Sequence, residues 1–276
     1  MHASVMACEY ACMHKPRTTV VYSEAGGATK TTTAVSLSVA MAEAGRRVIL
    51  IDLDPRGATT KWLGVEPTGP GLHVGAILAD PDPVGWVADL AVPSPWKRAG
   101  DLRVVPSHRQ VSNREKSSED HAELRLLQAL QGVDVDEVII DSPNRQGGPL
   151  IQNALNAADR VIYAGKLDED GLDGVEGART SVMRFKESRR MLGASDSLVE
   201  AGIVVGMVRD TILTRDSRRV RDIFGAEYGE LLLLPMIPER VVVREARAAG
   251  DFYGWYPAGE RVYRAYQEIA EKVMAR

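Results

Sequence analysis

The stretch YSEAGGATKTTT, residues 22–33, decides the fold of this chain. An apolar run at residues 18–22 leads into it and predicts a short buried strand, and residues 33–44 behind it have the composition and length of a helix. A strand, a glycine turn and a helix N-terminus can together hold a polyphosphate, because backbone N–H groups point at the anion. Lys30 would add a point charge, and the hydroxyl of Thr31 could ligate Mg²⁺. An ordinary strand–turn–helix connection is the alternative interpretation.

The chain has 276 residues and a formal net charge of −4, with 45% hydrophobic and 26% charged residues. This composition is typical of a soluble globular protein, and the length suits one large α/β domain or two small ones. The net charge argues against a generally basic nucleic-acid binder, although it is compatible with a single basic face. The sequence contains no run of 18 apolar residues, so we expect no transmembrane helix.

Residues 1–17 contain both cysteines of the chain, Cys8 and Cys12, together with His2 and His14. Their spacing matches no standard zinc pattern, so we favour a loose N-terminal tail over a metal site. The tail lacks the continuous apolar core of a secretory signal, and the absence of other cysteines fits a reducing cytoplasm. We therefore expect a cytoplasmic protein.

Further apolar runs predict strands that end in acids. The run at residues 46–55 ends in Asp52 and Asp54, and the run at residues 136–143 contains Asp141 near its C-terminal end. Continuous apolar runs suit a parallel sheet covered on both faces, and these acids then lie at the edge where such sheets carry their chemistry. The other strands are expected at residues 102–106, 160–164, 201–208 and 230–237.

Helix-length segments separate these strands. A short helix is expected among the loops of residues 56–100, near residues 74–78, with later helices at residues 122–130 and 259–274. The alternation of strand and helix predicts a single doubly wound, mostly parallel sheet with helices on both faces, in one α/β domain over residues 18–276.

Two segments concentrate positive charge, at residues 184–190 and 215–221. The arginines of the second segment are Arg215, Arg218, Arg219 and Arg221. One interpretation is a patch that binds DNA phosphates. The other is a solvated helix face with local ion pairs, since acidic residues are interspersed.

The glycine turn departs from the pattern G-x-x-x-x-G-K-[ST], because Glu24 and Thr29 stand where that pattern has glycine. It resembles instead the loop KGGxGKTT of the ParA/MinD family of deviant Walker A ATPases. The residues that match this loop are Gly26, Gly27, Lys30, Thr31 and Thr32. Ala25 stands at the position of the family's signature lysine, and Thr29 at the position of a glycine.

Further segments extend the resemblance over nearly the whole chain from Thr18 onward. Residues 48–64 resemble the family's switch I motif, and Asp141 matches the Walker B acid. Residues 153–159 resemble the helix after switch II, and residues 237–246 resemble the segment that lies by the adenine. Several motifs in the expected order indicate this family.

The resemblance implies a deviant P-loop NTPase fold with a site for ATP and Mg²⁺. Lys30 would bind the β- and γ-phosphates and Asp54 would orient the attacking water, so these two are the expected catalytic residues. Thr31, Asp52 and Asp141 would hold the Mg²⁺. The expected nucleotide-binding residues are Gly26, Gly27, Ala28, Thr29, Lys30, Thr31 and Thr32 in the loop, with Met207, Arg209, Pro238 and Arg240 around the base.

Within the family the chain looks most like a small, Soj-like ParA partition ATPase. Such a protein would bind Mg-ATP, self-associate as a dimer or higher assembly, and bind non-specific nucleoid DNA but no membrane. With a ParB-like centromere-binding partner it would segregate a plasmid, phage or chromosome, and it would be cytoplasmic and nucleoid-associated. The alternative is a nucleotide-dependent DNA-binding scaffold with negligible ATP hydrolysis.

Ala25 bears on how the protein assembles. In the family, the lysine at this position reaches the partner's phosphates across a face-to-face dimer, which an alanine cannot do. Either another cation takes its place, with Arg56 and Arg145 as candidates, or the ATP-bound assembly is not the usual sandwich dimer. We slightly favour the second outcome, and expect weak ATP hydrolysis in both. Glu24 is expected to face away from the phosphates, and Thr29 to strain or reshape the loop.

Overall fold

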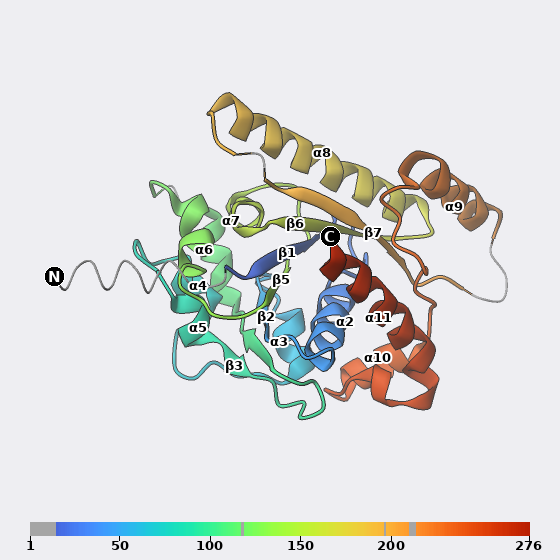
Figure 1. Ribbon diagram of the computed structural model, residues 1–276, viewed down its shortest axis with the longest axis horizontal. Helices are drawn as coiled ribbons and strands as arrows, with labels where there is room; N and C mark the ends of the chain where they lie inside the picture. Colours follow the sequence, from blue (N-terminus) through green and yellow to red (C-terminus); the bar gives the residue numbers. More distant parts are fainter. Residues whose placement is uncertain (1–14, 117–118, 196, 210–213) are drawn as a thin grey trace.

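The computed structural model describes residues 15–116, 119–195, 197–209 and 214–276, and a seven-stranded sheet forms its centre (Figure 1). The strand order is β3-β4-β2-β5-β1-β6-β7, and neighbouring strands are parallel except β3 and β4. The strands are β1 (Arg17–Tyr22), β2 (Val48–Asp52), β3 (Val92–Pro93), β4 (Leu102–Val105), β5 (Glu137–Asp141), β6 (Arg160–Lys166) and β7 (Val199–Gly206). This arrangement confirms the predicted doubly wound, mostly parallel sheet.

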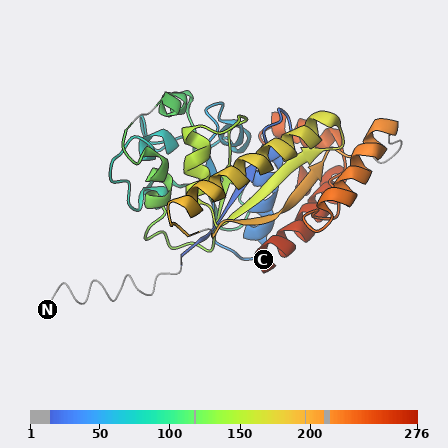
Figure 2. The same cartoon turned by 90° about the horizontal axis from the view of Figure 1, so that it is seen from above.

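Helices cover both faces of the sheet, because successive strand residues such as Val20 and Val21 point to opposite sides and enter different apolar clusters. One face is covered by α2 (Lys30–Glu43), α3 (Ala58–Leu63), α10 (Val241–Ala248) and α11 (Glu260–Ala275). The other is covered by α4 (Val74–Ile77), α5 (Trp86–Leu90), α6 (Arg125–Ala129), α7 (Pro149–Ala157), α8 (Glu169–Met191) and α9 (Arg215–Tyr228). Figure 2 shows the long helix α8 lying across the sheet.

Helix α2 follows the glycine turn and is buried on nearly all sides, with eleven of its 14 residues inaccessible. Its polar side chains are paired with tyrosines from the end of the chain. The hydroxyl of Thr33 lies 3.1 Å from that of Tyr266, and the hydroxyl of Ser36 lies 2.6 Å from that of Tyr253. Since buried hydroxyls need partners, these pairs hold α2 in place, with its N-terminus at the carboxyl edge of the sheet.

The predicted strand at residues 230–237 is wrong. The segment contributes one isolated bridge to the sheet, between Leu232 and Ile203, and forms no ladder. Pro235 lies within it and has no N–H to donate, so regular pairing cannot continue through that point. The loops expected at residues 56–100 also contain α3, α5 and the two-residue strand β3, and the helix predicted at residues 122–130 divides into a 3₁₀ turn, η2 (Ala122–Leu124), and α6.

Strand β1 begins at Arg17, one residue before the predicted boundary between tail and domain. The metal site considered for Cys8, Cys12, His2 and His14 lies outside the described residues. No helix of the described part of the chain combines the length and apolar character needed to cross a membrane.

Candidate nucleotide-binding site

A pocket of about 650 Å³ opens where β1, β2, β5 and β6 end, beside the N-terminus of α2. A cavity of this size can hold a ligand as large as a nucleotide. The predicted site residues that line it are Gly26, Gly27, Ala28, Thr29, Lys30, Thr31, Thr32, Asp54, Met207, Pro238 and Arg240. Arg209, Asp52 and Asp141 were also predicted but are not among the described residues that line it.

The loop between β1 and α2 adopts a backbone conformation that favours glycine. Gly27 has φ 65° and Thr29 has φ 64°, both in the left-handed region. This conformation strains a β-branched residue, so Thr29 has the unfavourable geometry that its sequence position predicted. Its side chain fits because β7 ends in glycine: a Cβ on Gly206 would lie 2.9 Å from the Thr29 hydroxyl oxygen. This buried hydroxyl has no hydrogen-bond partner among the described residues.

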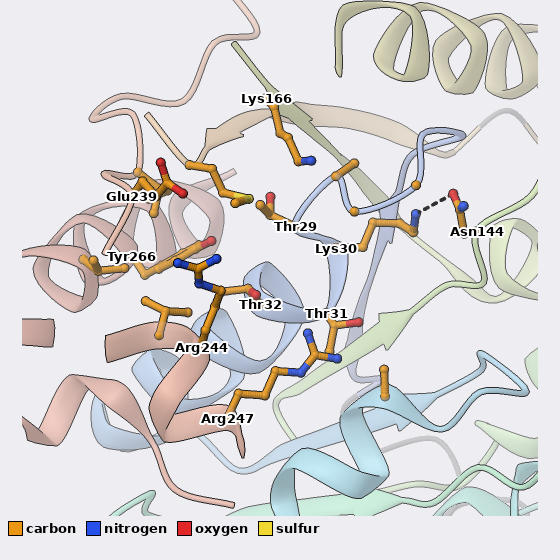
Figure 3. Close-up of a pocket in the computed structure, with 18 of the residues that line it drawn as sticks. Thr29, Lys30, Thr31, Thr32, Asn144, Lys166, Glu239, Arg244, Arg247 and Tyr266 are labelled. Atoms are coloured by element: carbon orange, nitrogen blue, oxygen red, sulfur yellow. Dashed lines mark hydrogen bonds between the residues drawn. The ribbon is translucent and has the colours of Figure 1, made fainter. Parts of the chain in front are cut away.

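Lys30 is buried, and its ammonium group lies beneath the loop (Figure 3). The ammonium donates hydrogen bonds to the carbonyl oxygens of Ser23 and Ala25, at 3.0 and 3.3 Å, and to Asn144 Oδ1 at 3.2 Å. Burial lowers the pKa of Lys30, and the negative charge of Asp141 partly opposes this. Because all three partners are uncharged, the positive charge is not neutralised by them and suits an anion in the pocket.

Two carboxylates lie buried behind the pocket, at paired positions of β2 and β5. Asp141 Oδ2 accepts a hydrogen bond from the Thr59 hydroxyl at 2.7 Å, whereas Oδ1 is buried with no partner among the described residues. Asp52 accepts hydrogen bonds from the N–H and hydroxyl of Thr60, at 2.8 and 2.7 Å, and from the N–H of Asp54 at 3.2 Å. Burial raises the pKa of both carboxyls, and the charge of Asp141 raises that of Asp52 further.

This set of oxygens fits a magnesium ion. Mg²⁺ is usually bound through one or two carboxylates together with phosphate oxygens and water, and a buried carboxylate oxygen without a donor needs a cation. Asp141 has such an oxygen, and Thr31, whose hydroxyl interacts with Asp141, lines the pocket. Asp52 already has hydrogen bonds on both oxygens, which suits a supporting role.

Asp54 lies in the segment after β2 and faces the pocket. Its Oδ1 accepts a hydrogen bond from the N–H of Arg56 at 2.9 Å, and its carbonyl oxygen accepts one from the Ser107 hydroxyl at 2.8 Å. The hydrogen bonds from Thr60 to the Asp52 carboxylate join the two ends of the same segment and so hold it in place. The carboxylate of Asp54 is therefore held at the pocket wall.

The end of the pocket where the base was predicted is formed by Met207, Pro238 and Arg240. Arg209 does not line it. Its Nε lies 3.1 Å from a carboxylate oxygen of Glu239, and its side chain is 71% exposed. We therefore place Arg209 at the surface beside the pocket, where it orients Glu239, which does line the cavity.

Several lining residues were not predicted from the sequence. Polar residues among them are Asn144, Lys166, Arg244 and Arg247 (Figure 3). Lys166 is the last residue of β6, and the end of a parallel strand at this edge was the available signal for it. Asn144 follows β5 in the same way, and Arg244 and Arg247 share one face of α10 by their i,i+3 spacing.

The first part of the loop packs against α8. The backbone N–H of Glu24 donates to the carbonyl of Gly174 at 3.1 Å, and the Glu24 carboxylate accepts bonds from the hydroxyls of Tyr22 (3.0 Å) and Ser181 (2.7 Å). Glu24 thus faces away from the pocket, as expected. The methyl group of Ala25 lies against Gly174 so closely that a Cβ on that glycine would collide with it.

The two arginines proposed as substitutes for the signature lysine differ in position. Arg56 lines the pocket, whereas Arg145 does not and forms an ion pair with Glu115. In this conformation the charge of Arg145 is therefore paired with Glu115 and does not reach the pocket.

The arginines predicted to bind DNA lie on α9, at the far side of β7 from the switch segments (Figure 1). Arg219 pairs with Glu169 and lies 3.6 Å from Asp216, and Arg221 pairs with Asp222 at 2.9 Å. Both interpretations of this segment therefore share one geometry, an exposed helix face with local ion pairs, and only a binding measurement separates them.

Comparisons with known proteins agree with this geometry. A family model described as an AAA domain matches residues 16–192. The chain is 29% identical to the chromosome-partitioning ATPase Soj of Thermus thermophilus, over 95% of this chain and 97% of that protein. It is 30% identical to the chromosome partitioning protein ParA of Caulobacter vibrioides, over 94% of each.

Solved structures show the same fold. Apo McdA of Cyanothece has a TM-score of 0.76 at 22% identity, over 92% of this chain and 98% of that one, a likeness that concerns the fold alone. Cobyrinic acid a,c-diamide synthase of Mycobacterium smegmatis, with a bound ATP analog and magnesium, has a TM-score of 0.73 at 27% identity, over 93% of each chain.

The parallel sheet, the glycine turn and the buried lysine at the start of α2 define a P-loop NTPase. The chain belongs to the ParA/MinD family of deviant Walker A ATPases and is Soj-like within it. Its relatives include the chromosome-partitioning ATPase Soj and the chromosome partitioning protein ParA named above.

Proposed function

We propose that this chain is a ParA-like partition ATPase whose domain, residues 18–276, binds Mg-ATP in the pocket. The observation that carries the proposal is that a buried lysine with uncharged hydrogen-bond partners, Lys30, occurs together with an unpartnered carboxylate oxygen of Asp141 near the N-terminus of α2. The lysine requires an anion and the carboxylate requires a cation. A magnesium-bound polyphosphate supplies both at once.

The residues then have distinct tasks. Lys30 exchanges its loop carbonyl partners for phosphate oxygens, and the N–H groups at the start of α2 face the same anion. Thr31 and Asp141 hold Mg²⁺, which would neutralise phosphate charge when bound, and Asp52 supports them. Asp54, fixed at the pocket wall, orients the attacking water. Met207, Pro238 and Arg240 contact the base.

Hydrolysis is weak in this proposal, because Ala25 brings no charge to the phosphates and Thr29 narrows the loop. The alternative is a nucleotide-dependent DNA-binding scaffold that hydrolyses ATP negligibly, and the same two residues favour it. Turnover measured in the presence of duplex DNA separates the two. A rate at the background level assigns the scaffold role.

The wider function follows the relatives. The chain self-associates and binds non-specific nucleoid DNA through Arg215, Arg218, Arg219 and Arg221, and a ParB-like centromere-binding protein is its partner. Together they segregate a plasmid, phage or chromosome. The support is that relatives matching nearly the whole chain are partition proteins.

The test compares Lys30→Ala and Asp54→Ala with Lys97→Ala, which removes an exposed lysine outside the pocket. Lys30→Ala should lose most ATP affinity, because it removes a charge-assisted contact in a confined site. Asp54→Ala should bind ATP and hydrolyse it at least about 100-fold more slowly, since orienting the water acts on the transition state. Calorimetric binding and phosphate release are the measurements. Wild-type affinity in Lys30→Ala would remove the proposed site.

A further inference from the structure

Lys166 ends β6, the strand that pairs with β1 on the side of the sheet towards β7. Its side chain enters the pocket and extends towards the loop that carries Thr29 and Lys30 (Figure 3). The ammonium nitrogen lies 3.3 Å from the position that a Cβ on Gly27 would occupy. Lys166 therefore places a second positive charge directly against the bend of the loop.

No carboxylate in the described part of the chain pairs with this charge. Among the described residues, Lys166 has no hydrogen-bond or ion-pair partner, whereas Lys30 has three oxygen partners. Nearby carboxylates are used elsewhere: Asp168 accepts the N–H of Gly171 at 2.8 Å, and Glu24 accepts the hydroxyls of Tyr22 and Ser181. Because Lys166 is only half-buried, water can solvate its ammonium group, but its position beside a turn rich in N–H groups suits an anion.

The backbone of Lys166 is held tightly, so the side chain starts from a fixed position. Lys166 pairs in register with Gly206 of β7. The first turn of α8 packs against this backbone. A Cβ on Gly171 would lie 2.5 Å from the backbone nitrogen of Lys166 and 2.6 Å from its carbonyl oxygen. Such a position is suited to a contact whose geometry must not vary.

The opposite side of the loop offers no such charge. The methyl group of Ala25 lies against Gly174 of α8 and carries no charge. Arg145 is paired with Glu115. Among the described cations that line the pocket, Lys166 combines an ammonium group without a hydrogen-bond or ion-pair partner with a position against the bend of the loop.

We propose that Lys166 is a second phosphate-binding cation of this site, and that it contacts an oxygen of the polyphosphate together with Lys30. The inference rests on the proposed function, since it takes the ligand to be a nucleotide. The phosphate belongs either to the nucleotide in the same chain or to that of a second copy facing it. Both sources offer the same chemistry, and the experiment separates them.

The experiment measures affinity for a non-hydrolysable ATP analogue by calorimetry in the wild type, Lys166→Gln, Lys166→Arg and Lys97→Gln. We expect Lys166→Gln to weaken binding roughly 10- to 100-fold, as for loss of a hydrogen bond to a charged group. Lys166→Arg should remain within a few-fold of wild type, because it keeps the charge. Lys97→Gln should match wild type, and melting of the nucleotide-free proteins reports whether each variant is folded.

Protein concentration separates the two sources of the phosphate. If the contact is within one chain, the Lys166→Gln defect persists at dilutions where light scattering shows a monomer. If it is between copies, the defect appears only where the wild type self-associates, and Lys166→Gln fails to dimerise with the analogue. Either result supports the proposal.

Failure has two distinguishable forms. If Lys166→Gln binds like the wild type and dimerises like it, while Lys30→Ala has lost binding, the pocket is a nucleotide site and Lys166 is not part of it. If the wild type binds no analogue, the proposed function is wrong and this inference is overturned with it.

Discussion

At the scale of single residues, the buried charge of Asp141 destabilises the folded protein and is also the group proposed to bind Mg²⁺. Its buried carboxylate has an oxygen without a partner, and burial raises its pKa. A carboxyl whose pKa is higher in the folded than in the unfolded chain stabilises the fold at low pH. That contribution is lost as the pH rises from the unfolded value through the raised one. The metal ion that it is proposed to hold would reverse this loss.

Asp141→Asn should therefore stabilise the protein when Mg²⁺ is absent. The amide keeps the shape and removes the charge, so the melting temperature in EDTA should exceed that of the wild type. The difference should grow from about pH 4 to about pH 7, across the raised pKa of about 6, by roughly 2–4 °C for each kcal/mol gained. Addition of Mg-ATP should raise the melting temperature of the wild type and leave the variant nearly unchanged. A variant that melts below the wild type at the higher pH would contradict this account.

At the scale of elements, the glycines of α8 allow the nucleotide loop to approach the helix. Gly174 accepts the N–H of Glu24 on its carbonyl and lies against Ala25. In an exposed helix, replacing glycine by alanine is favourable by about 0.5–1 kcal/mol. Here the added methyl group would displace the loop backbone, and the helix gain would be outweighed.

We expect Gly174→Ala to lower the free energy of unfolding by about 1–3 kcal/mol and to weaken nucleotide binding. The matched control is Gly225→Ala on α9, where nothing lies within 4 Å of the added Cβ. That variant should be more stable than the wild type and bind nucleotide normally. Urea denaturation and calorimetry measure the two effects. Equal behaviour of the two variants would show that the contact between loop and α8 has no energetic importance.

The strands could be predicted from the sequence where a continuous apolar run was the dominant signal. The buried parallel strands β1, β2 and β5 are continuous apolar runs, and their acids appear at the edge that the parallel arrangement dictates. The segment at residues 230–237 has the same apolar character, but Pro235 prevents a ladder. The proline was the available signal against a strand, because it has no N–H to donate to a ladder.

The candidate site was predictable as far as the motifs reached. Lys30, Thr31 and Asp54 follow from the loop and from the acid after β2, and all three line the pocket. Lys166 and Arg209 could not be placed in the same way. A long cationic side chain at or just after the end of a strand can reach either the solvent or the pocket. The packing of α8 fixes the backbone of Lys166, and the carboxylate of Glu239 holds Arg209 at the surface.

At the scale of the whole molecule, the proposed DNA binding would depend on charge that is spread over α9. Binding should be sequence-independent, favoured by ATP and weakened by salt. Neutralising Arg218, Arg219 and Arg221 together should reduce the slope of log affinity against log salt, by up to about 0.9 for each arginine that contacts a phosphate. The arginines that pair with Glu169 and Asp222 must exchange these partners for phosphates.

The matched control for this prediction neutralises three exposed arginines outside α9, namely Arg46, Arg98 and Arg109. It changes the net charge equally, so it separates a local patch from the general field of the protein. Fluorescence anisotropy with duplex DNA over a salt series is the measurement. Identical slopes for the two triple variants would assign the α9 arginines to a solvated helix face.

Assembly is expected to respond to the loop substitutions. Ala25→Lys with Thr29→Gly restores the family pattern, and the glycine also relieves the strained backbone at residue 29. We expect this variant to dimerise more strongly with ATP, or to hydrolyse it faster, than the wild type. Ala25→Met with Thr29→Gly is the control of similar length without charge. Light scattering and phosphate release are the measurements, and no gain over that control would contradict the prediction.

The pairing of α2 with the end of the chain also has a consequence for synthesis on the ribosome. The hydroxyl contacts of Thr33 and Ser36 close over 233 and 217 residues of sequence. At about 5–20 residues per second, the tyrosines emerge roughly 10–50 s after the helix that they cover. During that interval α2 has no partner for its outer face, so the nascent chain cannot complete the site. The pocket, which Val262 and Tyr266 help to line, is therefore complete only when translation is nearly finished.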